Sequence, residues 1–222
     1  MKVLAISPHP DDETLGCGGT LLRHRAEGDE LHWIVATEAH GPQWSEALLA
    51  QKAKEVDRVG KAFGMSSVNK LGLSTTQLDV TPRADLIEMF RKAIEVVRPE
   101  VVYLVHIGDM HTDHHVIFSS TLSVLKTFYM KSLGVRRILS WETLSSTEAA
   151  PQNPMRAFIP TVFRDITPYL DRKIEIMGMY ESEAQAEPLP RSASAIRALA
   201  RYRGASIGVE YAEAFMLVRE VE

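Results

Sequence analysis

Short apolar runs alternate along the chain with longer segments whose apolar residues recur every three or four positions. Runs of the first kind predict buried strands, and they cover residues 2–7, 31–37, 68–73, 101–105 and 136–141. Segments of the second kind predict helices, and they cover residues 14–27, 45–63, 83–97 and 115–133. This alternation predicts an α/β fold with a mostly parallel sheet between two helical layers, joined by right-handed crossovers.

The last third of the chain has a less regular pattern. Residues 143–160 are polar, contain prolines and predict a long loop. The elements expected beyond it are strands at 161–166 and 212–218 and helices at 171–180 and 193–202. We expect a single domain over residues 1–222, with a core at 1–142 and a C-terminal extension at 143–222 that completes the substrate pocket.

Composition and charge narrow the class of protein. Apolar residues make up 45% and charged residues 24% of the 222 residues, as in globular proteins. The net charge of -4 and the lack of a basic run argue against nucleic acid as the main partner. The one cysteine cannot form an intrachain disulfide. No segment reads as a signal peptide or a membrane span, so we expect a cytoplasmic protein.

The run Pro8-His9-Pro10-Asp11-Asp12-Glu13 directly follows the first predicted strand. Proline continues neither a helix nor a central strand, so the chain turns here and presents a histidine and two aspartates at the carboxyl end of the strand. Open α/β sheets bind their ligands at that edge. One imidazole and one carboxylate at this spacing can reach the same divalent metal, and the second carboxylate can hold a water on it.

A second cluster, His111-Thr112-Asp113-His114-His115, follows the strand predicted at residues 101–105. Two strand ends therefore each carry histidine and aspartate. Zinc in hydrolases typically takes three protein ligands and leaves one position to water. Two ligands from the first turn and one from the second would complete such a site.

Several nearby side chains also have simpler interpretations. Asp11 and Asp12 are typical helix N-cap residues, a role that is compatible with metal ligation. Glu13 is either a supporting partner of the site or an ordinary acid of the first helical turn. The glycine-rich run 16–19 favours close packing of a helix on a strand, because it lacks the spacing and the lysine of a phosphate-binding loop.

The residues around the second cluster leave similar choices open. His115 is more simply a histidine on a helix surface than a metal ligand. Asp109 and His106 either line the pocket or lie on the surface of a loop.

Together, Pro-His-Pro-Asp-Asp-Glu at 8–13 and His-x-Asp-His at 111–114 resemble the motifs of the LmbE-like (PIG-L) zinc-dependent N-deacetylases. Enzymes of this family remove acetyl groups from N-acetylglucosamine-type sugars and related conjugates. The resemblance covers most of the chain and implies a Rossmann-like three-layer αβα sandwich. It implies Zn²⁺, or another divalent ion such as Fe²⁺, bound by His9, Asp12 and His114.

The resemblance also implies catalytic roles. Asp11 would be the general base, His111 would stabilise the oxyanion and Asp113 would orient His111. Water bound to zinc has a pKa near ~7, so Asp11 can take its proton as it attacks the acetyl carbon. A protonated His111 would then hold the oxyanion, and Asp11 or His111 would protonate the departing amine, giving acetate and an amino sugar.

The sequence indicates the residues that contact the substrate less clearly than it indicates the metal ligands and the catalytic residues. The family commonly carries an arginine three positions before a glutamate, where this chain has Lys52 before Glu55. Lysine cannot make the bidentate contact of arginine, so Lys52 is a weaker candidate for substrate binding than that arginine. Trp44 and His40, in the loop before this helix, could stack on a sugar face or simply pack the loop.

Two arginines of the extension are further candidates for substrate binding. Arg191 and Arg203 could pair with an anionic group such as a nucleotide pyrophosphate. The alternative is that they form ion pairs with Glu210 or Glu213.

The sequence therefore predicts a zinc-dependent hydrolase that removes the N-acetyl group from an amino sugar or glycoconjugate. A nucleotide-linked sugar of polysaccharide biosynthesis is one option for its substrate. The rival functions are a metal-dependent esterase or phosphoesterase and a sugar-nucleotide binding module with a vestigial site. The resemblance further implies a homo-oligomer, a trimer or hexamer, with a small N-acetylated sugar as its binding partner.

Overall fold

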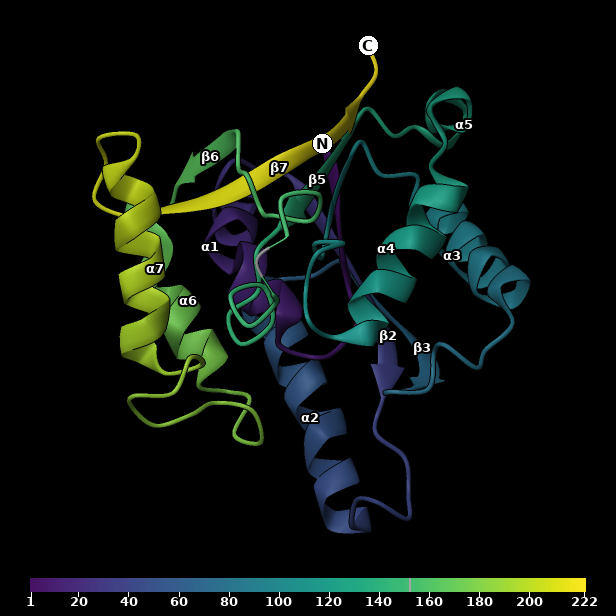
Figure 1. Ribbon diagram of the computed structural model, residues 1–222, viewed down its shortest axis with the longest axis horizontal. Coiled ribbons are helices and arrows are strands. Elements are labelled where there is room, and N and C mark those ends of the chain that lie inside the picture. Colours follow the sequence, from purple (N-terminus) through teal and green to yellow (C-terminus); the bar gives the residue numbers. More distant parts are fainter. Residues whose placement is uncertain (152) are drawn as a thin grey trace.

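The computed structural model describes residues 1–151 and 153–222, which form one seven-stranded sheet between two helical layers (Figure 1). The strands are β1 (Lys2–Ser7), β2 (Glu30–Glu38), β3 (Ser67–Ser74), β4 (Val101–Leu104), β5 (Arg137–Trp141), β6 (Val162–Asp165) and β7 (Ala212–Glu220). Their order is β3-β2-β1-β4-β5-β7-β6, and only β7 runs antiparallel to its neighbours. The predicted α/β fold with a mostly parallel sheet is confirmed.

Helices cover both faces of the sheet (Figure 1). On one face lie α1 (Asp12–Ala26), α2 (Glu46–Phe63), α6 (Leu170–Met177) and α7 (Ala193–Ala205), and on the other lie α3 (Arg83–Val97), α4 (Thr112–Val124) and α5 (Thr127–Leu133). A short 3₁₀ turn, Thr167–Tyr169, precedes α6. The central strand β1 is apolar from Val3 to Ile6 because Val3 and Ala5 pack into one core while Leu4 and Ile6 pack into the other.

The helix predicted at 115–133 is wrong in two respects. It begins earlier, at Thr112, because the side chain of His111 accepts a hydrogen bond from the backbone of the first turn. It also breaks into α4 and α5 where Leu125 leaves helical geometry at φ -92° and ψ 44°. Of the loop predicted at 143–160, position 152 lies outside the described residues.

Strand order brings the two sequence clusters together. From β1 the chain builds β2 and β3 on one side, then crosses back and adds β4 and β5 on the other side. The carboxyl ends of β1 and β4 therefore adjoin at the point where the winding direction reverses. Ligands of open α/β sheets bind at such a point.

Glycines allow α1 to lie directly on the sheet below this point. A Cβ atom added at Gly16 would lie 2.0 Å from the side chain of Trp141, and one at Gly19 would lie 2.8 Å from Ile166. The prediction that the glycine-rich run serves close packing is confirmed. Among the described helices, none combines the length and the apolarity needed to cross a membrane.

Candidate metal centre and active site

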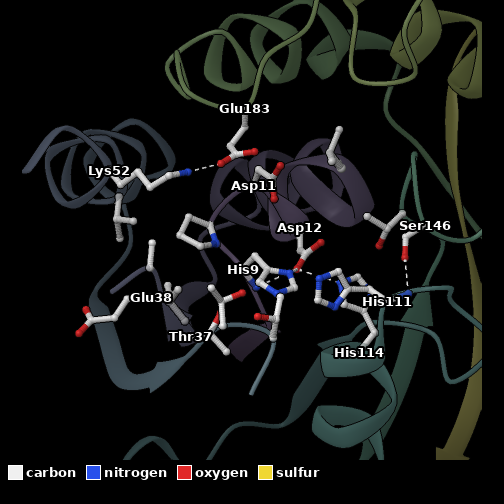
Figure 2. Close-up of a pocket in the computed structure, with 18 of the residues that line it drawn as sticks. His9, Asp11, Asp12, Thr37, Glu38, Lys52, His111, His114, Ser146 and Glu183 are labelled. Atoms are coloured by element: carbon white, nitrogen blue, oxygen red, sulfur yellow. Dashed lines mark hydrogen bonds and ion pairs between the residues drawn. The ribbon is translucent and has the colours of Figure 1, made fainter. Parts of the chain in front are cut away.

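A cavity of about 810 Å³ opens at the carboxyl edge of the sheet (Figure 2). Most of the residues predicted to form the site line it, and these are His9, Asp11, Asp12, Trp44, Lys52, His111, His114 and Arg191. Of the other two, Asp113 is buried behind the cavity wall and Arg203 lies elsewhere. The fold thus unites residues from both clusters and from the C-terminal extension.

The turn after β1 gives the first cluster its shape. Between His9 and the start of α1 the chain turns tightly enough for the His9 backbone N–H to donate to Asp12 Oδ2 at 2.8 Å. Asp11 has a φ of 108°, a left-handed conformation that few residues other than glycine adopt. Such a conformation costs on the order of 1–3 kcal/mol and is often found at functional sites.

Three imidazoles from the two strand ends meet in the cavity. The ring centre of His9 lies 4.3 Å from that of His111 and 5.4 Å from that of His114, and the latter two are 5.3 Å apart. One ligand atom from each ring lies within 4.8 Å of the other two. Figure 2 shows the three rings grouped beside the carboxylate of Asp12. These residues could hold a metal ion.

The distances from the Asp12 carboxylate to two of these rings are those expected between ligands of one metal ion. The Oδ2 atom of Asp12 lies 3.3 Å from His9 Nδ1 and 3.4 Å from His114 Nε2. Ligand atoms bound at about 2.0–2.1 Å around a tetrahedral zinc ion lie about 3.3–3.4 Å from one another. The residues present therefore fit zinc, and His111 offers a further imidazole beside them.

Two buried aspartates orient the imidazoles. Asp109 Oδ2 lies 2.7 Å from His114 Nδ1, and Asp113 Oδ2 lies 3.0 Å from His9 Nε2. Hydrogen bonds of this kind fix which ring nitrogen is left for a metal. The remaining nitrogens, His114 Nε2 and His9 Nδ1, are the two that lie nearest the Asp12 carboxylate.

The predicted contact of Asp113 with His111 is made by the Asp113 backbone N–H, which donates to His111 Nδ1 at 3.2 Å, and not by its carboxylate. The Asp113 carboxylate lies 4.0 Å from His111 Nδ1, which is beyond hydrogen-bond distance. Its Oδ2 atom instead contacts His9 and accepts a hydrogen bond from the backbone N–H of Thr76 at 2.8 Å. Since Asp113 lies in the first turn of α4, its side chain turns towards β1 and β3 rather than back along its own segment.

The ring of His111 is neutral, whereas the sequence led us to expect a protonated ring. Its Nδ1 accepts the backbone N–H of Asp113 at 3.2 Å, so the ring proton lies on Nε2. Burial, and then the positive charges of His9 and His114, lowers the pKa of His111 to about 4. The ring is therefore uncharged near pH 7 and can donate from Nε2.

The carboxylates keep the other two imidazoles protonated in the absence of a metal. Burial lowers the pKa of His9, but hydrogen bonds to Asp113 and Asp12 raise it to about 9. Burial lowers the pKa of His114 as well, but the charge of Asp12 and the contact with Asp109 raise it to about 10. A divalent cation bound here would take the place of these two protons.

Asp11 lies beside the imidazole cluster and is almost fully buried. Burial, and then the negative charges of Asp12 and Glu183, raises the pKa of Asp11 well above its usual range, and the guanidinium of Arg191 opposes this shift. Arg191 Nη1 lies 3.1 Å from Asp11 Oδ2. A buried carboxyl with a raised pKa in a cavity is suited to accept and return a proton.

Glu13 supports the turn that carries Asp11. It is fully buried, and its Oε2 atom accepts the backbone N–H of Asp11 at 3.3 Å. Its Oε1 atom accepts the hydroxyl of Tyr180 at 2.7 Å, so the C-terminal extension also holds this turn. Burial raises the pKa of Glu13 to about 7, while hydrogen bonds from Thr14 and Tyr180 oppose the shift. Of the two sequence interpretations, the structure favours the supporting partner.

A chain of ion pairs runs along the cavity wall from α2 to Asp11. Lys52 donates to Glu183 Oε1, and Arg191 Nη1 lies 2.8 Å from Glu183 Oε2 and 3.1 Å from Asp11. Figure 2 shows Lys52 reaching from α2 to Glu183. We call Lys52, Glu183, Arg191 and Asp11 the ion-pair chain. Sequence reasoning missed Glu183, because no local motif marks a loop residue whose partner lies 131 positions away.

Of the other residues predicted to contact the substrate, some line the cavity and one does not. Trp44 and His40 both line the cavity. Arg203 does not, because its Nε and Nη2 atoms pair with the two carboxylate oxygens of Glu142 at 2.7 and 2.6 Å. It therefore lies against a separate, much smaller hollow beside α7.

The alternative ion pairs predicted for these arginines are also absent from the described contacts. Glu213 is buried and pairs with Lys173 at 2.7 Å, while Glu210 lies near Arg201.

The choices left open around the second cluster are now settled. Asp109 is a buried partner of the site, although a loop-surface role was equally compatible with the sequence. His115 donates to the backbone carbonyl of Asp109 and stands apart from the three clustered rings. His106 donates from Nε2 to the carbonyl of Arg156 at 2.8 Å, which ties the loop after β5 to β4.

Comparison with protein families decides the assignment. Residues 4–125 match the model of the PIG-L family, described as GlcNAc-PI de-N-acetylase. This match covers more than half of the chain and contains both clusters. The chain belongs to the PIG-L family. The resemblance drawn from the two motifs is confirmed.

Individual relatives of this PIG-L protein extend over most of its length. A probable N-acetyl-alpha-D-glucosaminyl L-malate deacetylase 2 from Bacillus anthracis is 23% identical over 190 residues, which is 82% of this chain and 80% of the relative. Diacetylchitobiose deacetylase from Thermococcus kodakarensis is 23% identical over 229 residues, covering 98% and 83% of the two chains. The crystal structure of a conserved protein from Thermus thermophilus superposes with a TM-score of 0.77 at 26% identity, covering 99% and 96%.

Membership of the PIG-L family fixes the class of reaction. The protein is a deacetylase, a hydrolase that acts on a carbon–nitrogen bond other than a peptide bond. The substrate type of the family is an N-acetylated sugar, as its description states.

Proposed function

We propose that this PIG-L protein is a zinc-dependent hydrolase that removes the acetyl group from the nitrogen of an amino sugar or glycoconjugate and releases acetate. The observation that carries the proposal is the pair of 3.3 and 3.4 Å separations between Asp12 and the two imidazoles of His9 and His114, with Asp11 beside them. The names of the Bacillus and Thermococcus relatives support an N-acetylated sugar as the substrate.

In this proposal His9, Asp12 and His114 hold the metal ion. When bound, the ion supplies positive charge that polarises the acetyl carbonyl and lowers the pKa of a water molecule towards about 7. Asp113 and Asp109 hold the imidazoles of His9 and His114 in the orientation that leaves one ring nitrogen of each free for the ion.

Asp11 and His111 perform the proton and charge chemistry. Asp11 accepts a proton from water while the water oxygen bonds to the acetyl carbon. The Nε2–H of His111 donates to the oxygen on which negative charge develops, a contribution of about 3 kcal/mol for one such donor. The carbon–nitrogen bond then breaks, and Asp11 returns its proton to the departing amine. The oxygen of the water ends in acetate, and the proton carried by Asp11 ends on the amine of the free amino sugar.

The C-terminal extension, residues 143–222, is proposed to complete the pocket of a single domain whose core is residues 1–142. Ser146, Glu183 and Arg191 line the cavity from this extension. All three lie outside the residues that match the family model. The trimeric or hexameric assembly and the cytoplasmic location stay predictions from the sequence.

The option of a nucleotide-linked sugar rested on Arg191 and Arg203. Arg203 lies outside the cavity, and Arg191 is paired with two carboxylates. We therefore propose a substrate that forms no ion pair with either arginine.

Acetate release tests the proposed function. The protein is stripped with a chelator, reloaded with zinc and given N-acetylated sugars, free and glycosidic, beside their O-acetylated counterparts. We expect acetate from the N-acetyl compounds in the zinc-loaded state, loss of activity on stripping and recovery on reloading. Release from O-acetyl esters alone would support the esterase. Sugar binding without acetate release in the reloaded protein would support the binding module.

A further inference from the structure

Every lysine and arginine known to line the cavity already has an anionic partner. Among the described residues these cations are Lys52, Lys70 and Arg191. Lys70 Nζ lies 2.6 Å from Asp57 Oδ1, and the other two share the carboxylate of Glu183. The described wall therefore offers an anionic substrate no uncompensated side-chain cation.

Glu183 neutralises the two cations nearest the imidazole cluster. One of its oxygens accepts from Lys52, and the other lies 2.8 Å from Arg191 Nη1. The same Arg191 nitrogen lies 3.1 Å from Asp11, so two carboxylates face one guanidinium. The side chains of Lys52 and Glu183 are only 23% and 21% exposed, so water screens their charges less than at an open surface.

Contacts of the neighbouring residue hold Glu183 in place. The backbone N–H of Ser182 donates to Glu55 Oε1 at 3.1 Å, and its hydroxyl donates to Glu55 Oε2 at 2.7 Å. Lys52 also donates to the Ser182 hydroxyl at 3.1 Å. Since Glu55 is buried on α2, these contacts fix the backbone beside Glu183 against that helix.

A further carboxylate stands on the outer wall of the cavity. Glu38 lines it at the end of β2, 3.7 Å from the ring of His40, and is more than half exposed. It adds a further negative charge to the lining of the cavity. A phosphate or carboxylate of a substrate would therefore enter a cavity lined by the carboxylates of both Glu38 and Glu183.

We propose that Glu183 is a specificity-determining residue, which neutralises Lys52 and Arg191 and so makes the cavity select uncharged N-acetylated glycosides over sugar phosphates and sugar nucleotides. The inference rests on the proposed deacetylase function and names the substrate class of the same site. Such selection weakens the binding of anionic sugars rather than strengthening that of neutral ones. An anion loses its hydration near Glu183 without gaining an ion pair.

Two substrates that differ in charge at one position test the proposal. They are the methyl glycoside and the 1-phosphate of N-acetylglucosamine, with the same anomeric configuration. For the zinc-loaded protein we expect kcat/KM to be about tenfold higher for the methyl glycoside. Glu183→Gln keeps the shape of the side chain but leaves Lys52 without a carboxylate, so this preference should fall by about tenfold.

Glu181→Gln is the matched control. It makes the same substitution two positions away, where Glu181 pairs with Arg58 at 3.0 Å on the surface. This variant should keep the wild-type preference. Lys52→Gln leaves the charge of Glu183 less compensated and should strengthen the preference several-fold, which gives a second test in the opposite direction if Glu183→Gln does not fold.

Calorimetric binding of the two compounds gives the same comparison without turnover. Wild-type protein that favours the phosphate or treats both compounds equally would overturn the proposal, as would an unchanged preference in folded Glu183→Gln or Lys52→Gln. Acetate release from neither compound, combined with the expected binding preference, would overturn the proposed function and support the role of Glu183. The two failures are thereby distinguished.

Discussion

The two sides of the cavity are built from the chain in different ways. The metal side comes from two short clusters at the ends of the adjoining strands β1 and β4, and it lies within the part of the chain that matches the PIG-L family. The opposite side is the ion-pair chain, in which Lys52 of α2 meets Glu183 and Arg191 from the segment between α6 and α7. Local turns shape the first side, and contacts between distant segments shape the second.

This difference separates the reaction from the choice of substrate. The metal side carries the proposed metal ligands, base and oxyanion donor, all of which would act on the acetamide group itself. The ion-pair chain adds charges that a substrate meets beyond its acetamide group. Changes on the metal side should therefore remove the reaction for all substrates, while changes in Lys52 or Glu183 should alter the ranking of substrates. Asp11 and Arg191 are where the two sides join.

The largest effect is expected at Asp11. Asp11→Asn removes the proposed base but keeps the size of the side chain, so kcat should fall by about a thousandfold for every substrate. Zinc content, measured by mass spectrometry, should stay at the wild-type level, because the proposed ligands are untouched. A kcat near that of the wild type would show that another group takes the proton.

The next largest effect is expected from the partners of the imidazoles. Asp109→Asn weakens the hydrogen bond that orients His114, and zinc affinity should fall by about 10- to 100-fold. His114→Ala should lower it further, because a proposed ligand is lost. Competition with a chelator of known affinity measures both changes. Asp171→Asn, at an exposed ion pair with Arg197, is the matched control and should bind zinc normally.

The contrast between the two sides also explains how much could be predicted from the sequence. The meeting of the two clusters was predicted because each follows a strand end, and parallel sheets bring such ends together. The choice of His9, Asp12 and His114 as ligands came from the resemblance to the family. Arg191 and Lys52 were named as isolated candidates, but their partner Glu183 was not. Its position depends on how α2 packs against the extension, which no local pattern encodes.

The direction in which a side chain points was harder to predict from the sequence than the place of its residue in the fold. Asp113 was expected to orient His111 with its side chain, but its carboxylate lies beside His9 and only its backbone N–H contacts His111. The protonation of His111 was missed for a related reason. A backbone N–H donates to its Nδ1, and a contact of that kind depends on where the helix begins.

Zinc binding should release protons if the metal side works as proposed. Without metal, the pKa values of His9 and His114 are raised to about 9 and about 10, so both rings carry a proton at pH 7. Binding should therefore release about two protons per zinc ion, and affinity should fall as the pH is lowered. Calorimetry in buffers of different ionisation enthalpy gives this number. A value near zero would mean that these rings are not ligands.

The smallest effect is expected at Tyr180, where the extension touches the metal side through Glu13. Tyr180→Phe removes one buried hydrogen bond, so the free energy of unfolding measured in urea should fall by about 1–2 kcal/mol. Because Glu13 holds the backbone of Asp11 only through a 3.3 Å contact, kcat should fall by only a few-fold. Tyr202→Phe, at an exposed tyrosine of α7, should change neither quantity. A loss of kcat as large as that of Asp11→Asn would place Tyr180 in the reaction itself, and the division between the two sides of the cavity would have to be redrawn.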